Sequence, residues 1–364
     1  MSFSINSAPA KFVLEQNPAI GQIQLFNSSD LCQVANNTLK YIAHNIDTNN
    51  EDAIPPPMAL LVKSNITEKM VKNTLEFICT TYRHDVRNKQ NSRLQDSQFL
   101  KTNFHFYRWH ADSDKANAIA QKSTNEIKSR LLTNIPDKQL FITKYYTKLL
   151  TASSVKTPQF NQALYALPFD ETDLTLVEAE LQKSHLTRFK YTRQQIIQGA
   201  LTQNQLAQPL IWLTEESLHD VLLQGTGVLN VDGKTRYFNV HRNNGISYDY
   251  SIGKSAQARY WYFAEVSSIM GYGWEIGNKI EIKPQVTFAG NVGQLGLGKL
   301  IMINYLNNGQ SVNQMGVLAD TGGAFDNNLF QLDFLTDSYY GWDDYHQANK
   351  HLPDYANTWI MLKK

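Results

Sequence analysis

Long hydrophobic runs are missing from this sequence: nowhere do the ~20 consecutive apolar residues occur that a helix needs to cross a bilayer. The sequence therefore predicts no membrane-spanning helix. An excess of charge of one sign is also missing, because 34 Lys and Arg residues stand against 33 Asp and Glu residues, a formal net charge of +1. This balance gives no electrostatic reason to expect nucleic acid or an acidic membrane surface as a partner.

Cysteine is scarce, with only Cys32 and Cys79 in 364 residues. They lie far apart and match no metal-binding or redox spacing, so we interpret them as structural thiols, with a disulfide only if the compartment is oxidising. His105 and His110 have no third ligand nearby in the sequence, and no metal site is predicted.

The amino terminus lacks the charged start and the apolar stretch that are typical of a signal peptide. Two interpretations stay open. The chain is a mature fragment that begins with a new Met, or the protein is not exported by that route.

The composition is that of an ordinary globular chain, with 42% hydrophobic and 18% charged residues and enough length for two domains. Apolar spacing predicts helices over 28–46, 67–82 and 116–132, and a break over 51–57, where three prolines are consecutive. Aromatic residues cluster at 104–109, and we favour core packing over a sugar groove for them.

The stretch 316–334 reads G-V-L-A-D-T-G-G-A-F-D-N-N-L-F-Q-L-D-F. Its two glycines at 322 and 323 between apolar segments predict strand, tight turn, strand. Asp320 would end the first strand, and Asp333 would lie in the second between Leu332 and Phe334. A capping Asp in a hairpin is the simplest explanation of such a pattern. A carboxylate among aliphatic strand residues is nevertheless poorly placed for stability, which favours a functional role.

This stretch resembles the carboxy-terminal three-aspartate motif of the membrane-bound lytic murein transglycosylase A family. Further segments resemble the same family in the same order along the chain. They are a strand with Phe141, the segments 145–147, 163–168 and 192–201, Q-G-T-G at 224–227, N-N-G…Y…S-I-G-K over 243–254, and the final strand over 355–362. The chain departs from the family at Lys144, at Lys148 in place of a proline, and at Asn291, where the family has its first acidic residue.

The short alternating strands with glycine turns indicate a β-barrel. The resemblance implies a mostly β fold with N-terminal helices. A double-psi β-barrel domain would be formed by residues 1–147 and 287–364, and a second β-rich domain, residues 148–286, would be inserted in it. A groove between the two domains would hold a long substrate.

The resemblance also implies an activity: cleavage of peptidoglycan between N-acetylmuramic acid and N-acetylglucosamine, with capture by the muramyl 6-hydroxyl to give a 1,6-anhydro ring. One carboxyl group can act first as acid and then as base, and this requires a raised pKa. We predict Asp333 as this group, with Asp320 supporting it. The spacing is two residues longer than in the family, and without that insertion the catalytic position would fall on Gln331. No metal or organic cofactor is needed for this chemistry.

The remaining predictions concern the substrate and the surroundings of the protein. We expect glycan strands to be bound by flat aromatic faces and short polar groups; those implied are Tyr145, Tyr146, Thr147, Gln224, Tyr248 and Ser251. The resemblance implies a monomer, periplasmic or associated with the outer membrane if exported, with cell-wall synthesis or division proteins as possible partners. Two alternatives stay open: a glycan-binding protein of the same fold without catalysis, and a hydrolase that uses a second carboxylate as base.

Overall fold

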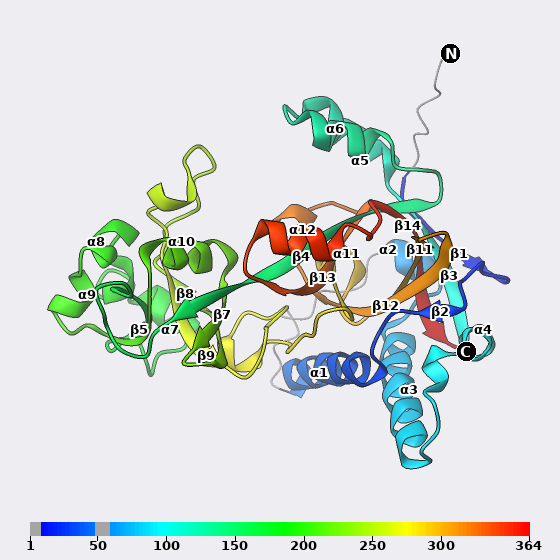
Figure 1. The fold of residues 1–364 in the computed structure, drawn as a ribbon, viewed down its shortest axis with the longest axis horizontal. Helices are drawn as coiled ribbons and strands as arrows, with labels where there is room; N and C mark the ends of the chain where they lie inside the picture. The colour runs from blue at the N-terminus through cyan, green and yellow to red at the C-terminus, as the bar shows by residue number, and fades with distance from the viewer. Residues whose placement is uncertain (1–8, 48–58) are drawn as a thin grey trace.

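The computed structural model describes residues 9–47 and 59–364, and its largest feature is a closed six-stranded β-barrel (Figure 1). The barrel strands are β4 (Gln139–Ala152), β10 (Thr287–Ala289), β11 (Leu300–Asn307), β12 (Gln310–Asp320), β13 (Gln331–Tyr339) and β14 (Tyr355–Lys363). Around the barrel the order is β14, β11, β12, β10, β13, β4 and back to β14. β10 is parallel to β12 and β13 is parallel to β4, while the other neighbours are antiparallel.

The amino-terminal part of the chain extends and covers this barrel. β1 (Lys11–Glu15) and β3 (Phe104–His110) continue the sheet beyond β14, and β2 (Ile23–Gln24) pairs with β12. The aromatic cluster of β3 is buried at Phe104, Phe106 and Trp109, so core packing is confirmed as its role. The helices of this part are α1 (Ser28–Asp47), α2 (Ala59–Lys63), α3 (Glu68–Arg87) and α4 (Ser97–Asn103).

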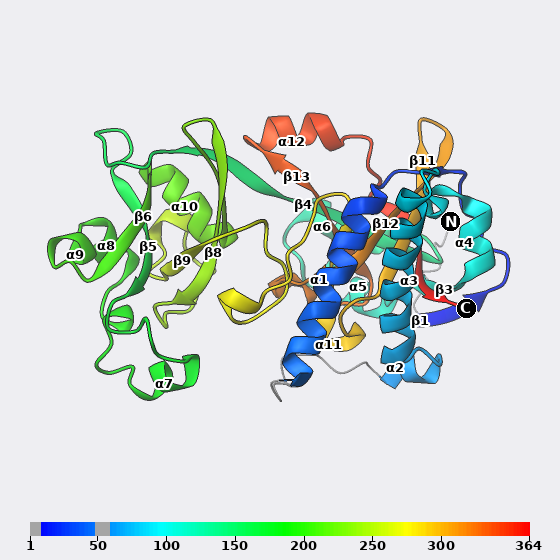
Figure 2. The same cartoon turned by 90° about the horizontal axis from the view of Figure 1, so that it is seen from below.

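Helices α1 and α3 lie side by side against the barrel and confirm the predictions for 28–46 and 67–82 (Figure 2). Thr67 caps α3, because its hydroxyl accepts a hydrogen bond from the Met70 amide at 3.3 Å. None of the helices in the described part of the chain is long and apolar enough to span a membrane. The predicted break over 51–57 lies outside the described residues.

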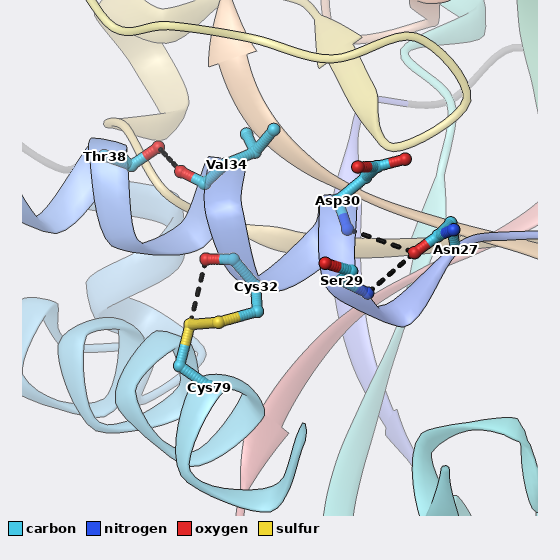
Figure 3. The surroundings of a disulfide bond; sticks show 7 residues. All are labelled: Asn27, Ser29, Asp30, Cys32, Val34, Thr38 and Cys79. Carbon is cyan, nitrogen blue, oxygen red and sulfur yellow. Dashed lines mark hydrogen bonds between the residues drawn. A yellow bond between two sulfur atoms is a disulfide. The ribbon is translucent and has the colours of Figure 1, made fainter. Parts of the chain in front are cut away.

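A disulfide joins Cys32 of α1 to Cys79 of α3 (Figure 3), so the preferred interpretation as structural thiols is wrong and the alternative that was left open, a disulfide, is present. Spacing along the sequence could not reveal the pair, because 47 residues separate the two cysteines. Side-by-side packing of the two helices brings their Cα atoms to 4.7 Å.

The single helix predicted for 116–132 is two helices, α5 (Ser113–Lys122) and α6 (Glu126–Thr133), that project from one end of the barrel (Figure 1). The Asn125 side chain accepts a hydrogen bond from the Lys128 amide at 3.0 Å and caps α6. A capping asparagine begins a new helix, and the apolar spacing on both sides concealed this interruption.

The middle of the chain forms a second β-rich lobe with a hydrophobic core of its own (Figure 1). β7 (Thr226–Val231), β8 (Lys234–Asn243) and β9 (Trp261–Val266) extend the sheet from the far end of β4. β5 (Gln162–Pro168) pairs with β6 (Ala207–Leu213), and the helices are α7 (Leu176–Leu181), α8 (Arg193–Ile197), α9 (Ala200–Gln203) and α10 (Glu215–Gln224). The prediction of a mostly β fold with N-terminal helices, a barrel and a β-rich insert is confirmed. The exact domain boundaries stay predictions, and β4 runs without a break across position 147/148.

The two strands predicted within 316–334 are present as β12 and β13, but they do not form a hairpin, because β10 lies between them and pairs with both. The connection between them also contains a 3₁₀ turn at Gly323–Phe325, so it is not a tight two-residue turn. Gly316 permits this arrangement, since a Cβ atom there would stand 2.8 Å from the Val286 carbonyl oxygen just before β10.

Candidate active site

Two carboxylates and a threonine lie in one row across the end of the barrel. Asp320 of β12 is paired with Ala289 of β10, Ala289 with Asp333 of β13, and Asp333 with Thr143 of β4. Two inter-strand spacings separate the backbones of Asp320 and Asp333, which is about 9–10 Å. The inserted strand β10 therefore sets the distance between the two carboxylates.

Both oxygens of Asp320 accept hydrogen bonds. The Tyr145 hydroxyl donates to Oδ2 at 2.8 Å, and the Thr321 amide donates to Oδ1 at 2.8 Å. Burial raises the pKa of Asp320 to about 6, although both hydrogen bonds and the charge of Lys279 act to lower it. The hydrogen bonds therefore fix the orientation of the Asp320 carboxylate. As pH rises, this group loses its proton near pH 6 and is mostly ionised at neutral pH.

Asp333 differs from Asp320 in having a free oxygen. Its side chain is partly exposed, but Oδ1 is buried and has no hydrogen-bond partner among the described residues. The neighbouring Thr143 hydroxyl donates to the Leu332 carbonyl at 3.3 Å. Burial raises the pKa of Asp333 to about 7, with Asp320 raising it further while Thr143 and Lys144 lower it. A carboxyl group that exchanges its proton near neutral pH has the property that general acid–base chemistry requires.

Gln331, the alternative to Asp333, lies two residues earlier on the same face of β13. Its amide nitrogen donates to the Thr143 hydroxyl at 2.7 Å, and its amide oxygen accepts from Asn328 at 3.1 Å. The amide is thus engaged in holding β4 and the turn before β13, and an amide cannot donate a proton as an acid.

Asn291, which replaces the family's first acidic residue, has a structural contact. Its side-chain oxygen accepts from the Gln294 amide at 3.0 Å and caps the short helix α11 (Val292–Leu295). The preceding Gly290 contacts the carboxylate strand, since its amide donates to the Asp320 carbonyl at 3.2 Å.

The predicted binding residues on β4 lie beside the row, on alternating faces of the strand. Tyr145 reaches Asp320, as described. The ring of Tyr146 stacks on Tyr345 of α12 (Trp342–Asn349), with ring centres 4.5 Å apart. Thr147 is buried, and its hydroxyl lies 2.6 Å from the hydroxyl of Ser338 on β13.

Gln224 lies at the end of α10 and joins the same group. Its side-chain oxygen accepts from the Lys148 amide at 3.0 Å, and its nitrogen donates to the Tyr146 carbonyl at 3.4 Å. The structure therefore brings Gln224 beside Tyr146 of β4.

Tyr248 and Ser251 are in a loop of the insert, and their contacts are local. The Ser251 hydroxyl donates to Asp249 at 2.6 Å, and the Tyr248 ring lies 4.9 Å from the Arg259 guanidinium. Neither makes a described contact with the carboxylate row, so their predicted role in binding rests on the resemblance alone.

Sequence reasoning missed three residues near the carboxylates: Thr143, Lys279 and Tyr345. Thr143 had a signal, because it lies two residues before Tyr145 on a strand and so shares its face. Lys279 and Tyr345 had none, since both approach from distant segments.

Lys144 and Lys148, noted as departures from the family, bond to acidic residues: Lys144 to Asp354 at 3.1 Å, and Lys148 to Asp220. The described residues hold no cluster of three or more His, Cys, Asp or Glu side chains suited to a metal ion.

The closed barrel and the β-rich insert that follows its first strand define the class of fold: the chain has the fold of the lytic murein transglycosylases. The model of the "MltA specific insert domain" matches residues 141–268. The chain therefore carries the MltA-specific insert domain on the MltA fold, and the resemblance to this family is confirmed.

Solved structures of this fold align along the chain at low sequence identity. A membrane-bound lytic murein transglycosylase from Agrobacterium tumefaciens is 15% identical, with 98% of each chain covered and a TM-score of 0.59. MltA of E. coli with bound chitohexaose is 15% identical, with 100% of this chain and 97% of that chain covered and a TM-score of 0.55. MltA from Neisseria gonorrhoeae is 14% identical over 74% of this chain and 78% of that chain, with a TM-score of 0.51. No curated protein matches the sequence.

Proposed function

We propose that the protein is a lytic transglycosylase that cleaves the β-1,4 bond between N-acetylmuramic acid and N-acetylglucosamine in peptidoglycan and forms 1,6-anhydromuramic acid. The observation that carries this proposal is the Asp333 carboxyl group, with its buried, unpartnered Oδ1 and a pKa raised by burial to about 7. A substrate oxygen would supply the missing partner.

In this mechanism Asp333 performs both proton transfers. Its protonated form donates to the glycosidic oxygen as the bond to the anomeric carbon breaks. The resulting carboxylate then takes the proton from the muramyl 6-hydroxyl as that oxygen bonds to the same carbon. Atoms balance without water, and Asp333 ends protonated as it began. A pKa near the working pH serves both steps.

The contacts of Asp320 favour this scheme over hydrolysis. A hydrolase needs a second carboxylate free to act as nucleophile or to activate water. Tyr145 and Thr321 occupy the two oxygens of Asp320, so its role would be electrostatic. Its negative charge would stabilise positive charge that develops on the sugar ring.

We propose a periplasmic or outer-membrane-associated location. A disulfide persists in an oxidising compartment, which agrees with Cys32–Cys79. The relative from Agrobacterium tumefaciens is described as membrane-bound, which supports the same location.

The substrate we propose is the glycan strand of peptidoglycan, because the E. coli relative is described with bound chitohexaose. A monomeric state and contacts with cell-wall synthesis or division proteins stay predictions from the resemblance.

The test compares Asp333→Asn with Asp337→Asn, which removes an exposed carboxylate from the same strand. Each variant is incubated with purified sacculi, and the soluble products are separated and weighed by mass spectrometry. We expect the parent and Asp337→Asn to release 1,6-anhydromuropeptides, and Asp333→Asn to release none while it remains folded.

Other outcomes identify the alternatives. Undiminished product from Asp333→Asn rejects this residue as the acid. Products heavier by one water from the parent indicate a hydrolase. Binding to sacculi without any soluble product from the parent, across pH about 4 to 8, indicates a glycan-binding protein without catalysis.

A further inference from the structure

The segment 244–260 joins β8 to β9 and projects from the insert beside α10 (Figure 1). Two buried side-chain amides hold it in one shape. Asn244 accepts a hydrogen bond from the Tyr260 amide at 2.9 Å, which closes the base of the segment. Gln257 accepts from the Asp249 amide at 2.9 Å and donates to the Asp249 carbonyl at 2.7 Å. The groups that the segment presents are therefore positioned before any ligand arrives, which lowers the cost of binding.

Arg259 lies near the end of this segment, and its guanidinium contacts two aromatic rings. The guanidinium carbon is 4.9 Å from the centre of the Tyr248 ring and 5.3 Å from the centre of the Trp261 ring. Such contacts stabilise the cation, but they leave its N–H groups without acceptors. No described residue accepts a hydrogen bond from this guanidinium, and its Nε is buried without a partner. A buried donor without an acceptor is unfavourable, so an oxygen atom of a ligand would stabilise it.

The charge of Arg259 is also unpaired. Arg193 is almost fully buried, and its Nε donates to the Arg259 carbonyl at 2.7 Å. Burial, and after it the charge of Arg259, lower the pKa of Arg193 to about 10, because two cations lie near each other. Within the described part of the chain, neither arginine forms an ion pair with an acidic side chain. The nearby carboxylates have other partners: Asp220 with Lys148 and Lys254, Glu215 with His219, and Asp249 with Ser251.

The other arginines that contact aromatic rings show what Arg259 lacks. In the described structure there are four of them, and each also pairs with a carboxylate: Arg93 with Asp85, Arg108 with Glu15, Arg188 with Glu171, and Arg236 with Glu265. A ring satisfies the face of the planar guanidinium and a carboxylate satisfies its edge. Arg259 has the ring contacts without the carboxylate. A carboxylate from outside the chain would complete the same arrangement.

Two tyrosines add hydrogen-bond donors at the same place. Tyr248 and Tyr250 pack edge to face with their ring centres 5.1 Å apart, and Tyr250 is 92% exposed. Burial lowers the pKa of Arg259, and both phenol groups are close enough to oppose this effect. Neither hydroxyl has a hydrogen-bond partner among the described residues. One guanidinium and two neutral hydroxyls supply a single positive charge, which one carboxylate neutralises and a phosphate dianion would exceed.

We propose that Arg259, with Tyr248 and Tyr250, forms a binding site on the insert for a carboxylate group. Two parallel hydrogen bonds from the guanidinium edge to the carboxylate oxygens would hold the ligand. The carboxylate can belong to a peptide, such as the peptide substituents of peptidoglycan, or to a small free acid. This site goes beyond the proposed function, since its ligand is not the sugar backbone and it needs no proton transfer at Asp333.

Calorimetry with the parent protein compares four probes: succinate, its neutral analogue succinamide, inorganic phosphate, and a stem peptide of peptidoglycan with free carboxylates. Arg259→Gln removes the charge, and Arg259→Lys keeps the charge but removes the planar fork. Arg236→Gln is the matched control, because Arg236 also lies over an aromatic ring of the insert but already pairs with Glu265. Thermal unfolding establishes that each variant is folded before it is titrated.

We expect the parent to bind succinate and the stem peptide but not succinamide. Arg259→Gln should weaken this binding about tenfold or more, the loss of a charge-assisted hydrogen bond. Arg259→Lys should lose less, and Arg236→Gln should match the parent. Tighter binding of the peptide than of succinate identifies a peptide as the source of the carboxylate, and equal binding identifies a free acid; both outcomes support the site.

Four results would overturn the proposal. The first is a folded parent that binds neither carboxylate, and the second is an unchanged affinity in Arg259→Gln. The third is an equal loss in Arg236→Gln, which would indicate a general effect of charge on the insert. The fourth is binding of succinamide as tight as that of succinate, or of phosphate tighter than both carboxylates.

Discussion

At the scale of single residues, Asp320 and Asp333 differ in how many of their oxygens are satisfied. Asp320 accepts hydrogen bonds at both oxygens, whereas Oδ1 of Asp333 is buried without a partner in the described structure. Burial raises both pKa values, to about 6 and about 7. Between these values Asp320 is mostly ionised and Asp333 mostly protonated, which agrees with the proposed role of charge for Asp320 and of acid for Asp333.

The pH dependence of activity follows from this difference. We expect product release from sacculi to rise as Asp320 ionises near pH 6 and to fall as Asp333 loses its proton near pH 7. Removing the Tyr145 hydroxyl in Tyr145→Phe removes a hydrogen bond that lowers the pKa of Asp320, so the acidic limb should move to higher pH. Initial rates between pH about 4 and 9 test this. A rate that stays maximal well above pH 8 would contradict the assignment.

Stability should also depend on the ionisation of Asp333. Its pKa is raised on folding, so its favourable contribution is complete below about pH 4 and is lost as pH rises through about 7. Asp333→Asn does not titrate. We expect its unfolding free energy to exceed that of the parent by about 2 kcal/mol at pH 8 and to match it near pH 4, after allowance for partial exposure. Denaturant unfolding at both pH values measures this.

The control for that comparison is Asp337→Asn, whose carboxyl group is exposed. It should differ from the parent by the same small amount at both pH values. A constant difference between Asp333→Asn and the parent would show that the carboxyl group is not destabilised by burial.

At the scale of elements, the 271–280 segment is packed closely against the end of β12. A Cβ atom on Gly271 would stand 2.5 Å from the Ala319 carbonyl oxygen, whereas one on Gly277 would meet nothing within 4 Å. Gly271→Ala should therefore lower the stability by about 1–3 kcal/mol, and Gly277→Ala should be nearly neutral. Thermal unfolding of the two variants tests this, and equal melting temperatures would contradict the packing.

The disulfide connects α1 to α3 and closes a long loop. With a sequence separation of 47 residues, the chain-entropy relation gives a stabilisation of about 4 kcal/mol as an upper figure. The double variant Cys32→Ser with Cys79→Ser should melt at a lower temperature than the parent. Reductant should lower the melting temperature of the parent only. Two thiols titrated in the unfolded, unreduced parent would show that the bond is absent.

At the scale of the whole molecule, one buried carboxylate links the barrel strand to the insert. Asp220 of α10 accepts hydrogen bonds from Lys148 of β4 and from Lys254, which begins a 3₁₀ turn shortly after Ser251. These two bonds hold the pKa of Asp220 below its usual value against the effect of burial. The contact lies where β4 leaves β13 and begins to pair with β7.

Breaking this link should loosen the insert relative to the barrel. We expect Asp220→Asn to lose about 2 kcal/mol of stability, since two lysines lose their shared anion. Glu265→Gln is the matched control, because it removes a carboxylate from the more exposed Arg236–Glu265 pair and should change stability by less than about 1 kcal/mol. Calorimetric unfolding compares the two, and equal effects would show that the junction gains nothing from the buried charge.

Much of this protein follows from local patterns in its sequence. The apolar spacing of α1 and α3, the aromatic strand β4 and the carboxylates at 320 and 333 are properties of short segments, because helix and strand periods of 3.6 and 2 repeat within a few residues. The resemblance to the transglycosylase family depended on equally short motifs. The error at this level is the single helix predicted over 116–132. One capping residue, Asn125, begins the second helix α6 and divides the segment in two.

Other features were decided only by tertiary structure. β10 enters between β12 and β13 and turns an expected hairpin into a row of two separated carboxylates. Helix packing brings Cys32 to Cys79, and the fold of the insert brings Asp220 to Lys148. The helix and strand periods of the sequence do not encode contacts between distant segments. Such contacts depend on the entropy cost of closing long loops and on which apolar faces pack together. Both contributions to the folding free energy involve the whole chain.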